Sequence, residues 1–373
     1  MDLIHAIQPD LQEYVLPMLT VPGKLTQALP FGNGHINNTY LLTFQQETGE
    51  SRRYILQQIN TSVFQEPEHL MENILSVCNY LKEKIADQGG DVERECLTLL
   101  PFTNGLYLFR DTFGRTWRYC LYIENSVSYD LPESPAMMEA AGQAFGLLQT
   151  RLDGYPAESL WETIPHFHDT GRRYEAFLQA IRENTAGRVS EVQEEILFWT
   201  HRYQDFFRLR PFVEKGLLPL RVTHNDTKLN NVLFDKDTGN PLCVVDLDTV
   251  MPGLSLYDFG DALRSGANTA AEDETDLSKV SFSLEVYEAF TRGFLSQTRE
   301  ILSPAEKELL PFSAKLMTME CGIRFLTDYL QNDVYFKIHR PRHNLERCRT
   351  QIKLVQDMEK KMGEMENIFR NCL

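Results

Sequence analysis

A chain of 373 residues is longer than one hydrophobic core usually organises, so two lobes or domains are expected. The apolar share of 42%, with 11% aromatic residues, is ample for packed cores and excludes a disordered chain. The formal net charge of −16 disfavours nucleic acid and anionic membranes as partners, because both attract a basic protein face.

The compartment is predicted from three further features. No apolar run reaches the roughly 18 residues that a membrane helix needs. Residues 1–20 contain early acids and no basic start, so no signal peptide is expected. The seven cysteines are odd in number, widely spaced and free of Cys-x-x-Cys pairs, which is typical of reduced thiols. We therefore expect a soluble, cytoplasmic protein with no membrane partner.

The chain opens with a predicted packing helix and a glycine turn. Residues 1–20 place apolar side chains at helical spacing, which predicts an amphipathic helix. Residues 25–44 then indicate a strand, a turn containing Gly32, Asn33 and Gly34, and a second strand. Backbone amides in such a turn can approach a phosphate group, although an ordinary hairpin turn is the alternative for Gly-x-Gly alone.

The remaining elements predict a β-rich part followed by a helical part. Further strands are expected at residues 53–60, 97–101, 107–109 and 116–124, with one helix at about 68–84. Helices are expected from residue 134 onwards and at 173–183, 190–208, 284–297, 304–330 and 344–370. We therefore predict an α+β fold with a small N-terminal lobe at residues 1–123 and a larger, mainly helical C-terminal lobe at 124–373.

A polar stretch at residues 164–170 contains His166, His168 and Asp169. A zinc site would require a third and a fourth ligand at matching spacing, and the neighbouring sequence offers none. A structural loop, or a loop close to the substrate, is therefore the preferred interpretation over a metal site.

The most informative stretch runs from residue 220 to residue 264. A strand ends at His224, a polar loop carries Asp226 and Asn231, and a hairpin ends at Asp246 and Asp248. A carboxylate that accepts a hydroxyl proton, together with oxygen ligands for a metal, is what magnesium-assisted phosphoryl transfer requires.

Three other acids and a histidine of this stretch are assigned supporting positions. His224 is expected to hold the loop by hydrogen bonding, since the histidine in this kind of loop is not the base. Asp248 is a candidate second metal ligand or a partner of one. Asp258 and Asp261 resemble the start of a helix, and N-terminal capping is the preferred interpretation over holding the loop in shape.

The order His224-x-Asp226, then Asn231, then Asp246 after a short hairpin resembles the catalytic and metal-binding segments of the kinase-like phosphotransferases. That family includes the aminoglycoside phosphotransferases and choline kinases. The resemblance implies a bilobal kinase-like fold that uses ATP and Mg²⁺. It implies that Asp226 is the catalytic base and that Asn231 and Asp246 are the metal ligands.

The same resemblance suggests where the nucleotide binds. The glycine turn would approach the phosphates, and backbone groups at the lobe connection would bond the adenine. The candidates are Gly32, Asn33, Gly34, Tyr122, Ile123 and Glu124. Kinases usually carry a phosphate-binding lysine on the third strand, but this strand offers Gln57 and Gln58, whose neutral amides cannot supply a cationic contact.

Longer blocks of sequence are similar to the bacterial N-acetylhexosamine 1-kinases. They lie at residues 31–37, 54–58, 166–170, 221–231 and 318–326. This resemblance implies phosphorylation of the anomeric hydroxyl of GlcNAc or GalNAc to the sugar 1-phosphate, and it makes the missing strand lysine a family trait. The implied sugar-binding residues are His35, Asn38, Asp226, Arg324 and Tyr335. Asn38 stands where the family has an Asp, so the charge at that contact is lost.

Residue patterns alone leave alternatives open. Without the resemblance, Arg324 is a helix-surface arginine that packs its stem on apolar neighbours. The chain can instead be a kinase for another small alcohol, such as homoserine, choline or an amino alcohol. A non-catalytic nucleotide-binding module is a further alternative, although Asp226, Asn231 and Asp246 are all retained. The expected partner is a small-molecule sugar, and the expected state is a monomer or a weak homo-oligomer.

Overall fold

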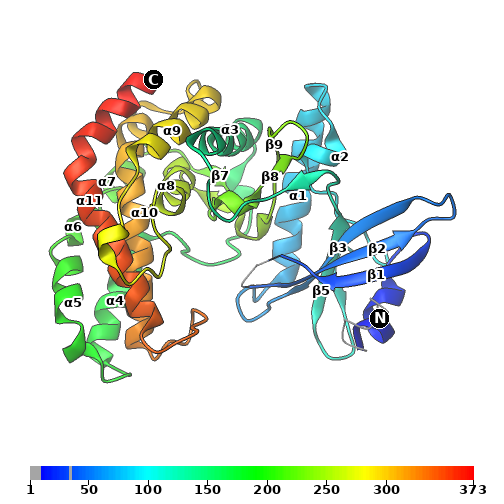
Figure 1. Cartoon of the computed structure of the whole chain (residues 1–373), viewed down its shortest axis with the longest axis horizontal. Helices are drawn as coiled ribbons and strands as arrows, with labels where there is room; N and C mark the ends of the chain where they lie inside the picture. The colour runs from blue at the N-terminus through cyan, green and yellow to red at the C-terminus, as the bar shows by residue number, and fades with distance from the viewer. Residues whose placement is uncertain (1–9, 33–35) are drawn as a thin grey trace. The chain divides into compact units, whose positions relative to one another are not determined.

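The computed structural model describes residues 10–32 and 36–373, and the chain divides into two compact units (Figure 1). The N-terminal unit consists of Met1–Val127 and Phe234–Val250, and the C-terminal unit consists of Ser128–Leu233 and Met251–Leu373. The first unit contains an antiparallel sheet and the second is mainly helical, so the predicted α+β class is confirmed. None of the helices in the described ranges combines the length and the apolar character needed to cross a membrane.

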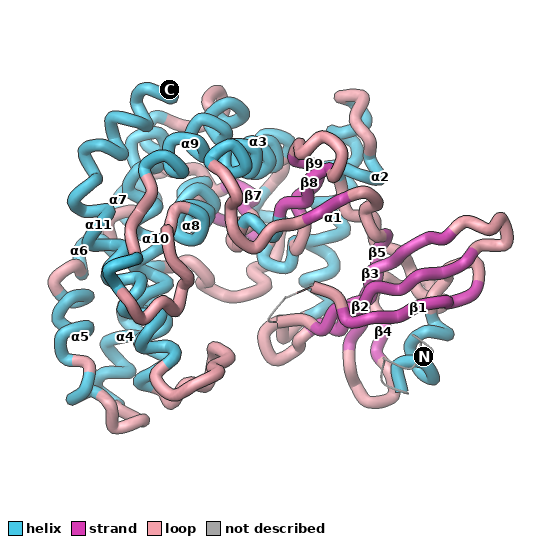
Figure 2. Tube along the Cα trace, in the orientation of Figure 1, coloured by secondary structure: helices cyan, strands magenta, loops and turns pink. Residues whose placement is uncertain are grey.

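The sheet of the N-terminal unit has five strands in the order β1-β2-β3-β5-β4 (Figure 2). The strands are β1 (Lys24–Pro30), β2 (Asn38–Gln45), β3 (Ser51–Ile59), β4 (Phe109–Arg110) and β5 (Thr116–Leu121). Alternate residues of these strands face a core in which Leu42, Tyr54, Leu56, Trp117 and Tyr119 are buried. The alternation of apolar and polar residues therefore positions one face of each strand against this core.

The rest of the N-terminal unit consists of short helices, one long helix and a small sheet. The long helix is α1 (Pro67–Asp87), followed by α2 (Val92–Glu95), and the small sheet has the order β6 (Ser126–Val127), β8 (Val232–Asp235) and β9 (Pro241–Val244). The helix predicted at 1–20 is described only from residue 10 onwards. There it forms a π-helix at Leu11–Val15 and a 3₁₀ turn at Leu16–Met18.

The strand predicted at residues 97–101 is not formed, and this prediction was wrong. Leu99 makes only an isolated bridge to Cys120, and the amide of Leu100 donates to the carbonyl of Tyr119 at 3.1 Å. Pro101 has no amide hydrogen, so it cannot extend a ladder with β5. The prediction at 107–109 is reduced to the two-residue strand β4.

The C-terminal unit is built from helices with two short strands. The helices are α3 (Pro135–Arg151), α4 (Thr170–Glu183), α5 (Gln193–Thr200), α6 (Tyr203–Phe206), α7 (Arg210–Glu214), α8 (Ser255–Gly266), α9 (Leu284–Thr298), α10 (Pro304–Leu330) and α11 (His343–Cys372). The strands β7 (Arg221–Thr223) and β10 (Met251–Gly253) pair antiparallel. Helix α10 packs against α11, α8 and α4, so it is the central element of this unit.

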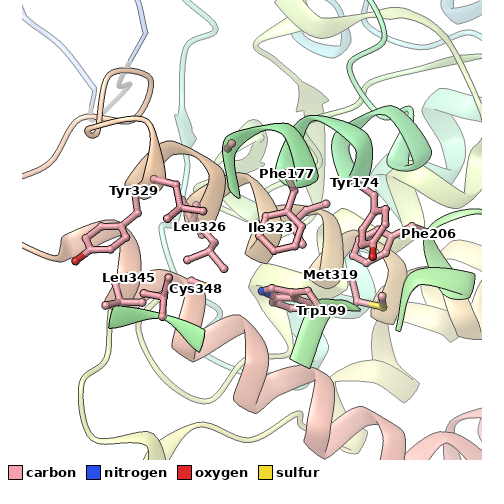
Figure 3. Packing of buried hydrophobic residues seen from close by; sticks show 14 of the residues in the cluster. Tyr174, Phe177, Trp199, Phe206, Met319, Ile323, Leu326, Tyr329, Leu345 and Cys348 are labelled. Carbon is pink, nitrogen blue, oxygen red and sulfur yellow. The ribbon is translucent and has the colours of Figure 1, made fainter. Parts of the chain in front are cut away.

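A hydrophobic cluster that contains several aromatic rings packs α10 against its neighbours (Figure 3). Trp199 of α5 is fully buried among Phe177, Met319 and Ile323, with Cys348 of α11 in the same cluster. At the start of α10, Ser303 and Glu306 form a reciprocal capping box, which satisfies amides that the helix itself leaves unbonded. The helix is therefore fixed both by its end and by its apolar face.

The helix predicted at residues 190–208 is divided into α5 and α6. The hydroxyl of Thr200 donates to the carbonyl of Ile196 at 2.9 Å, and Arg202 Nη1 donates to the carbonyl of Phe198 at 3.0 Å. These side chains occupy carbonyls at the end of α5. The single-helix prediction was therefore wrong, because side-chain bonds at the break are not encoded in apolar spacing.

Helices α3 and α9 approach closely through glycines. A Cβ added to Gly142 would overlap the backbone of Phe290, and one added to Gly293 would overlap the backbone of Glu139. Backbone atoms cannot rotate away as the end of a side chain can. Only glycine, which has no Cβ, therefore fits at these two positions.

Gly293→Ala is expected to destabilise the C-terminal unit by about 1–3 kcal/mol, because the methyl group overpacks the contact with α3. Thermal unfolding of the full chain measures the effect. Gly363→Ala in α11 is the matched control, since its Cβ would enter open space. That change is expected to stabilise the helix by about 0.5–1 kcal/mol. Equal melting temperatures for the two variants would contradict the close packing of α3 and α9.

Candidate active site

The loop that follows β7 is held by carboxylates of α8. Asp258 accepts hydrogen bonds from the amides of His224 and Asn225 at 3.1 and 2.8 Å. Asp261 accepts from the amide of Thr227 at 3.1 Å. Asp258 and Asp261 lie inside α8 and do not cap its N-terminus, which begins after Leu254 without a side-chain cap. The interpretation of these two acids as caps was therefore wrong, and they bind the loop instead.

Asp226 lies on this loop and is partly exposed. Its Oδ1 pairs with Nζ of Lys228 at 2.7 Å, and Nδ2 of Asn231 donates to its backbone carbonyl at 2.7 Å. Burial alone would raise the pKa of Asp226, but the charge and hydrogen bond of Lys228, with the charge of Arg264, outweigh burial and hold its pKa below the ordinary value. Asp226 is therefore ionised at neutral pH, as a proton acceptor must be.

His224 is fully buried and takes part in shaping the turn. Its Nδ1 accepts a hydrogen bond from the amide of Asp226 at 3.2 Å, and its ring packs edge-on against Phe145 at 5.8 Å. Asn225 has a φ of 63°, a left-handed conformation that Asn tolerates better than most residues. These contacts agree with the prediction that His224 holds the loop.

His168 connects this loop to α10. One ring nitrogen, Nε2, lies 2.9 Å from the carbonyl oxygen of Asn225, and the other, Nδ1, lies 2.9 Å from Oε1 of Glu320. Arg324, one turn further along α10, places Nη1 3.7 Å from the same Glu320 oxygen. Both nitrogens of His168 are thus engaged by protein atoms, which removes the zinc alternative for this histidine.

Arg324 is surrounded by aromatic rings rather than by solvent. Its guanidinium lies 5.2 Å from the ring centroid of Phe167, 5.8 Å from that of Tyr335 and 5.5 Å from that of Phe336. The predicted sugar residues Arg324 and Tyr335 are therefore adjacent in the C-terminal unit. Spacing along the chain did not indicate this group, because its members come from the loop before α4, from α10 and from the loop after α10.

Two interactions hold this group in place. Arg173 of α4 donates from Nη2 and Nε to the carbonyl of Phe167 at 2.8 and 3.0 Å. The carboxylate of Asp328 accepts from the amide of Tyr335 at 2.7 Å and from that of Phe336 at 2.9 Å. Arg173 was not among the predicted site residues. Its only signal in the sequence was its position next to the block at residues 166–170.

The predicted metal ligand Asp246 belongs to the N-terminal unit, where it follows β9. Its φ of 61° and ψ of 56° place a non-glycine residue in the left-handed region, a strained conformation that is frequent at functional sites. Two residues later, Asp248 pairs with Nη1 of Arg118 at 2.5 Å and accepts a hydrogen bond from Nδ2 of Asn37 at 2.7 Å. Asn37 also accepts from the amide of Asn60 at 2.9 Å.

Of the predicted glycine-turn residues, only part lies in the described structure. Gly32 has a φ of 75°, a conformation that glycine adopts without strain. Asn33, Gly34 and the predicted sugar residue His35 lie outside the described residues. The side chain of Asn38 donates to Gln58 at 3.1 Å, at the start of β2.

The predicted adenine-binding segment follows β5. The amide of Tyr122 donates to the carbonyl of Arg53 at 3.1 Å, and the Arg53 guanidinium lies 4.2 Å from the Tyr122 ring centroid. Arg53 also forms an ion pair with Glu124. The carbonyl of Ile123 accepts from the hydroxyl of Ser126 at 2.6 Å. The backbone of this segment is thus held in one conformation by β3 and by its own turn.

The C-terminal unit also contains a cavity of about 370 Å³. It is lined by residues of the 166–171 loop, of α7 and of the segment from β10 to Tyr257. Its lining includes His168 and Asn225 but neither Asp226 nor Arg324. We therefore do not assign the phosphate acceptor to this cavity.

The sheet, the helical unit and an ionised Asp226 on a loop that ends in Asn231 agree with the kinase-like class that the sequence predicts. Residues 27–293 match the phosphotransferase enzyme family APH, and this match covers more than half of the chain. The chain belongs to that family.

Solved structures support the fold assignment. The chain is similar to an ethanolamine kinase of Plasmodium vivax, with a TM-score of 0.55, 14% identity and coverage of 87% of this chain and 82% of that chain. It is similar to a choline kinase from Cryptosporidium parvum, with a TM-score of 0.52, 14% identity and coverage of 92% of this chain and 91% of that chain. It is also similar to the amicoumacin kinase hAmiN, solved with AMP-PNP and Ca²⁺. Here the TM-score is 0.57 and the identity is 12%, with coverage of 96% of this chain and 95% of that chain. These low identities show the fold and leave the substrate open.

The buried pair of His168 and Glu320 predicts a pH-dependent stability. Burial lowers the pKa of His168, but the charge and hydrogen bond of Glu320 outweigh it, so the pKa is raised above the ordinary value of 6.5. A raised pKa in the folded state means that the pair stabilises fully below about pH 6.5 and loses its effect as the pH rises through the folded pKa. The stability of the wild type should therefore decline over this range more steeply than that of His168→Gln.

Melting temperatures measured from pH 5.5 to 9 for both proteins check this prediction. The groups that face His168 include Glu320 and Asp261, and Arg173 and Arg324 act on Glu320 in turn. Glu320→Gln is the second variant, because it keeps the shape of the acceptor and removes its charge. Parallel curves for all three proteins would show that His168 is neutral when the chain is folded.

Proposed function

We propose that this phosphotransferase is an ATP- and Mg²⁺-dependent kinase that phosphorylates the anomeric hydroxyl of GlcNAc or GalNAc to the sugar 1-phosphate. The observation that carries the proposal is the pair of arginines, Arg173 and Arg324, next to the aromatic rings of Phe167 and Tyr335. The pKa of Arg173 is lowered by burial and by the charge of Arg324, which places two cations in one small region.

This charge disfavours the alternative acceptors of the same family. Choline, ethanolamine and other amino alcohols carry a positive charge, which the two guanidinium groups would repel. Glu320, the acid of this group, is already paired with His168. A neutral sugar meets no such repulsion, and it has hydroxyls that accept hydrogen bonds and an apolar ring face that packs on aromatic side chains.

Asp226 takes the role of base in the proposed reaction. The sugar hydroxyl gives its proton to the carboxylate while its oxygen bonds to the γ-phosphorus of ATP, and the bond from that phosphorus to the bridging oxygen breaks to release ADP. Lys228 keeps the carboxylate ionised and in place. The contacts through Asn225, His168 and Glu320 then position Arg324 relative to the loop that carries the base.

The two residues that the resemblance assigns to the metal carry the kind of donor atom that Mg²⁺ binds. When bound, Mg²⁺ neutralises charge on the phosphates. We propose Asn231 and Asp246 as its protein ligands, because both offer the oxygen atoms that Mg²⁺ prefers. The amide nitrogen of Asn231 is bonded to the carbonyl of Asp226, so its oxygen is the atom presented to a ligand. Mg²⁺ uses one or two carboxylates together with waters and phosphates. It therefore does not need the cluster of three acids or histidines that the described residues lack.

The remaining contacts of the proposed function come from the resemblance. The nucleotide would be bound by Gly32, Asn33 and Gly34 and by the backbone of residues 122–124. His35 and Asn38 would complete the sugar site. The AMP-PNP bound to the amicoumacin kinase supports a nucleotide as the phosphate donor for this fold.

An acceptor panel tests the proposal. ADP release is measured with GlcNAc, GalNAc, glucose, choline, ethanolamine and homoserine, and the product is identified by NMR. We expect turnover with the N-acetylhexosamines and a phosphate on the anomeric oxygen. Turnover with a charged alcohol alone would identify a different kinase, and no turnover with any acceptor would indicate a nucleotide-binding module.

Asp226→Asn keeps the size of the side chain and removes the proton acceptor. We expect kcat to fall by about 10²-fold to 10⁴-fold, the usual contribution of a positioned base. Circular dichroism should show an unchanged fold. A variant with near-wild-type turnover would exclude Asp226 as the base.

Arg324→Met removes the guanidinium and keeps an unbranched apolar stem. We expect KM for the sugar to rise by about tenfold to a hundredfold with little change in KM for ATP, because a charged hydrogen-bond donor is lost on one substrate only. Arg347→Met is the matched control, since Arg347 also lies beside an aromatic ring, that of Phe325, at 5.5 Å. Equal sugar KM values for these two variants would rule out a role for Arg324 in acceptor binding.

A further inference from the structure

The third strand of the sheet, β3, contains no lysine, and its two arginines, Arg52 and Arg53, form ion pairs with Glu93 and Glu124. Protein kinases place a lysine there, which contacts the α- and β-phosphates and is oriented by an acid. In this chain Gln57 occupies β3 and is paired in register with Arg118 on β5. Directly paired residues of neighbouring antiparallel strands project from the same face, so Arg118 shares the face of Gln57.

Arg118 is fixed by contacts on two sides. Its Nε donates to Oε1 of Gln57 at 3.0 Å, and its Nη1 lies 2.5 Å from Oδ1 of Asp248. Gln57 is itself oriented, because its Nε2 donates to Oγ1 of Thr39 at 3.2 Å. Only 5% of the Arg118 surface is exposed. A guanidinium carries five N–H donors, which is more than these two contacts use.

The surroundings of Arg118 connect it to the proposed metal ligand and to the glycine turn. Burial lowers the pKa of Arg118, but Asp248 and Asp246 both raise it, so it stays charged and lies within electrostatic reach of both acids. Asp248 is in turn bonded to Asn37, which lies at the end of the β1–β2 turn that contains Gly32. All of these residues belong to the N-terminal unit.

We infer that Arg118 supplies the cationic contact to the nucleotide phosphates, with Gln57 as the residue that orients it and Asp248 as its partner acid. This inference rests on the proposed function as far as a nucleoside triphosphate is the donor, and it does not depend on the identity of the acceptor. The phosphate-binding cation would thus lie on β5 in this chain, and not on β3 as in protein kinases. Arg suits this position better than Lys, because its planar fork can bond an acid and a phosphate at the same time.

A purely structural ion pair is the competing explanation. In that case Arg118 would only connect β5 to the segment after β9. Its loss would then lower the stability of the fold without a specific effect on the affinity for ligands that carry phosphate groups. The two explanations therefore differ in how binding depends on the phosphates of the ligand.

The test measures ligand binding by calorimetry on the full chain, without any acceptor. ATP, ADP and adenosine are compared for the wild type and for Arg118→Met, in the presence of Mg²⁺. We expect the affinity for ATP and ADP to fall by about tenfold to a hundredfold and the affinity for adenosine to stay the same. Equal losses for all three ligands, or no loss for any, would overturn the inference.

Arg115→Met is the matched control. Arg115 precedes β5 and forms ion pairs with Asp10 and, at 2.6 Å, with the buried Asp111, not with Asp248. Its loss should lower the melting temperature and leave the ratio of ATP to adenosine affinity unchanged. A change in that ratio as large as that of Arg118→Met would contradict a specific role for Arg118.

A second variant keeps the test decisive if Arg118→Met does not fold. Gln57→Lys combined with Arg118→Met returns the cation to β3, where it can pair with Asp248. We expect this double variant to fold and to bind ATP more tightly than adenosine, as the wild type does. A folded double variant without this preference would overturn the inference. A wild type that binds ATP but does not phosphorylate N-acetylhexosamines would reject only the proposed acceptor.

Discussion

The site of this protein depends on two buried carboxylates that bind backbone amides. Residues 224–228 lie outside the helices and strands, so their amides need other acceptors. Asp258 and Asp261 of α8 provide them for His224, Asn225 and Thr227. Burial raises the pKa of Asp258, and the hydrogen bonds from the loop amides and from Gln149 act against that rise. Loss of these acceptors would leave the loop without its conformation, so the ionised Asp226 depends on helix α8.

The same loop is connected to α10 by hydrogen bonds that run through the interior of the C-terminal unit. The carbonyl of Asn225 contacts His168, His168 contacts Glu320, and Glu320 attracts Arg324. Because each member is buried or nearly so, each contact is stronger than the same contact in water. The loop that carries Asp226 and the proposed acceptor contact Arg324 are thereby connected within the C-terminal unit, which suits a reaction that depends on positioning.

Three arginines of this acidic chain are held by specific contacts, one of them buried and two half-buried. Arg118 in the N-terminal unit and Arg173 and Arg324 in the C-terminal unit are each held by hydrogen bonds, an acid or aromatic rings. A net charge of −16 would repel a nucleotide at long range, so the proposed nucleotide binding requires local positive charge to offset this repulsion. Arginine can be buried in this way because it stays charged and bonds through several donors.

The sequence by itself determined the features that are local along the chain. Alternating residues predicted β1, β2 and β3, apolar spacing predicted α1 and α10, and the order of Asp226, Asn231 and Asp246 indicated the reaction class. Only the tertiary structure decided the partners of these residues. His168 and Glu320 are 152 positions apart, and Gln57 and Arg118 are 61 apart. Such pairs form because packed helices and paired strands bring distant residues together, and neither periodicity nor motif spacing records that contact.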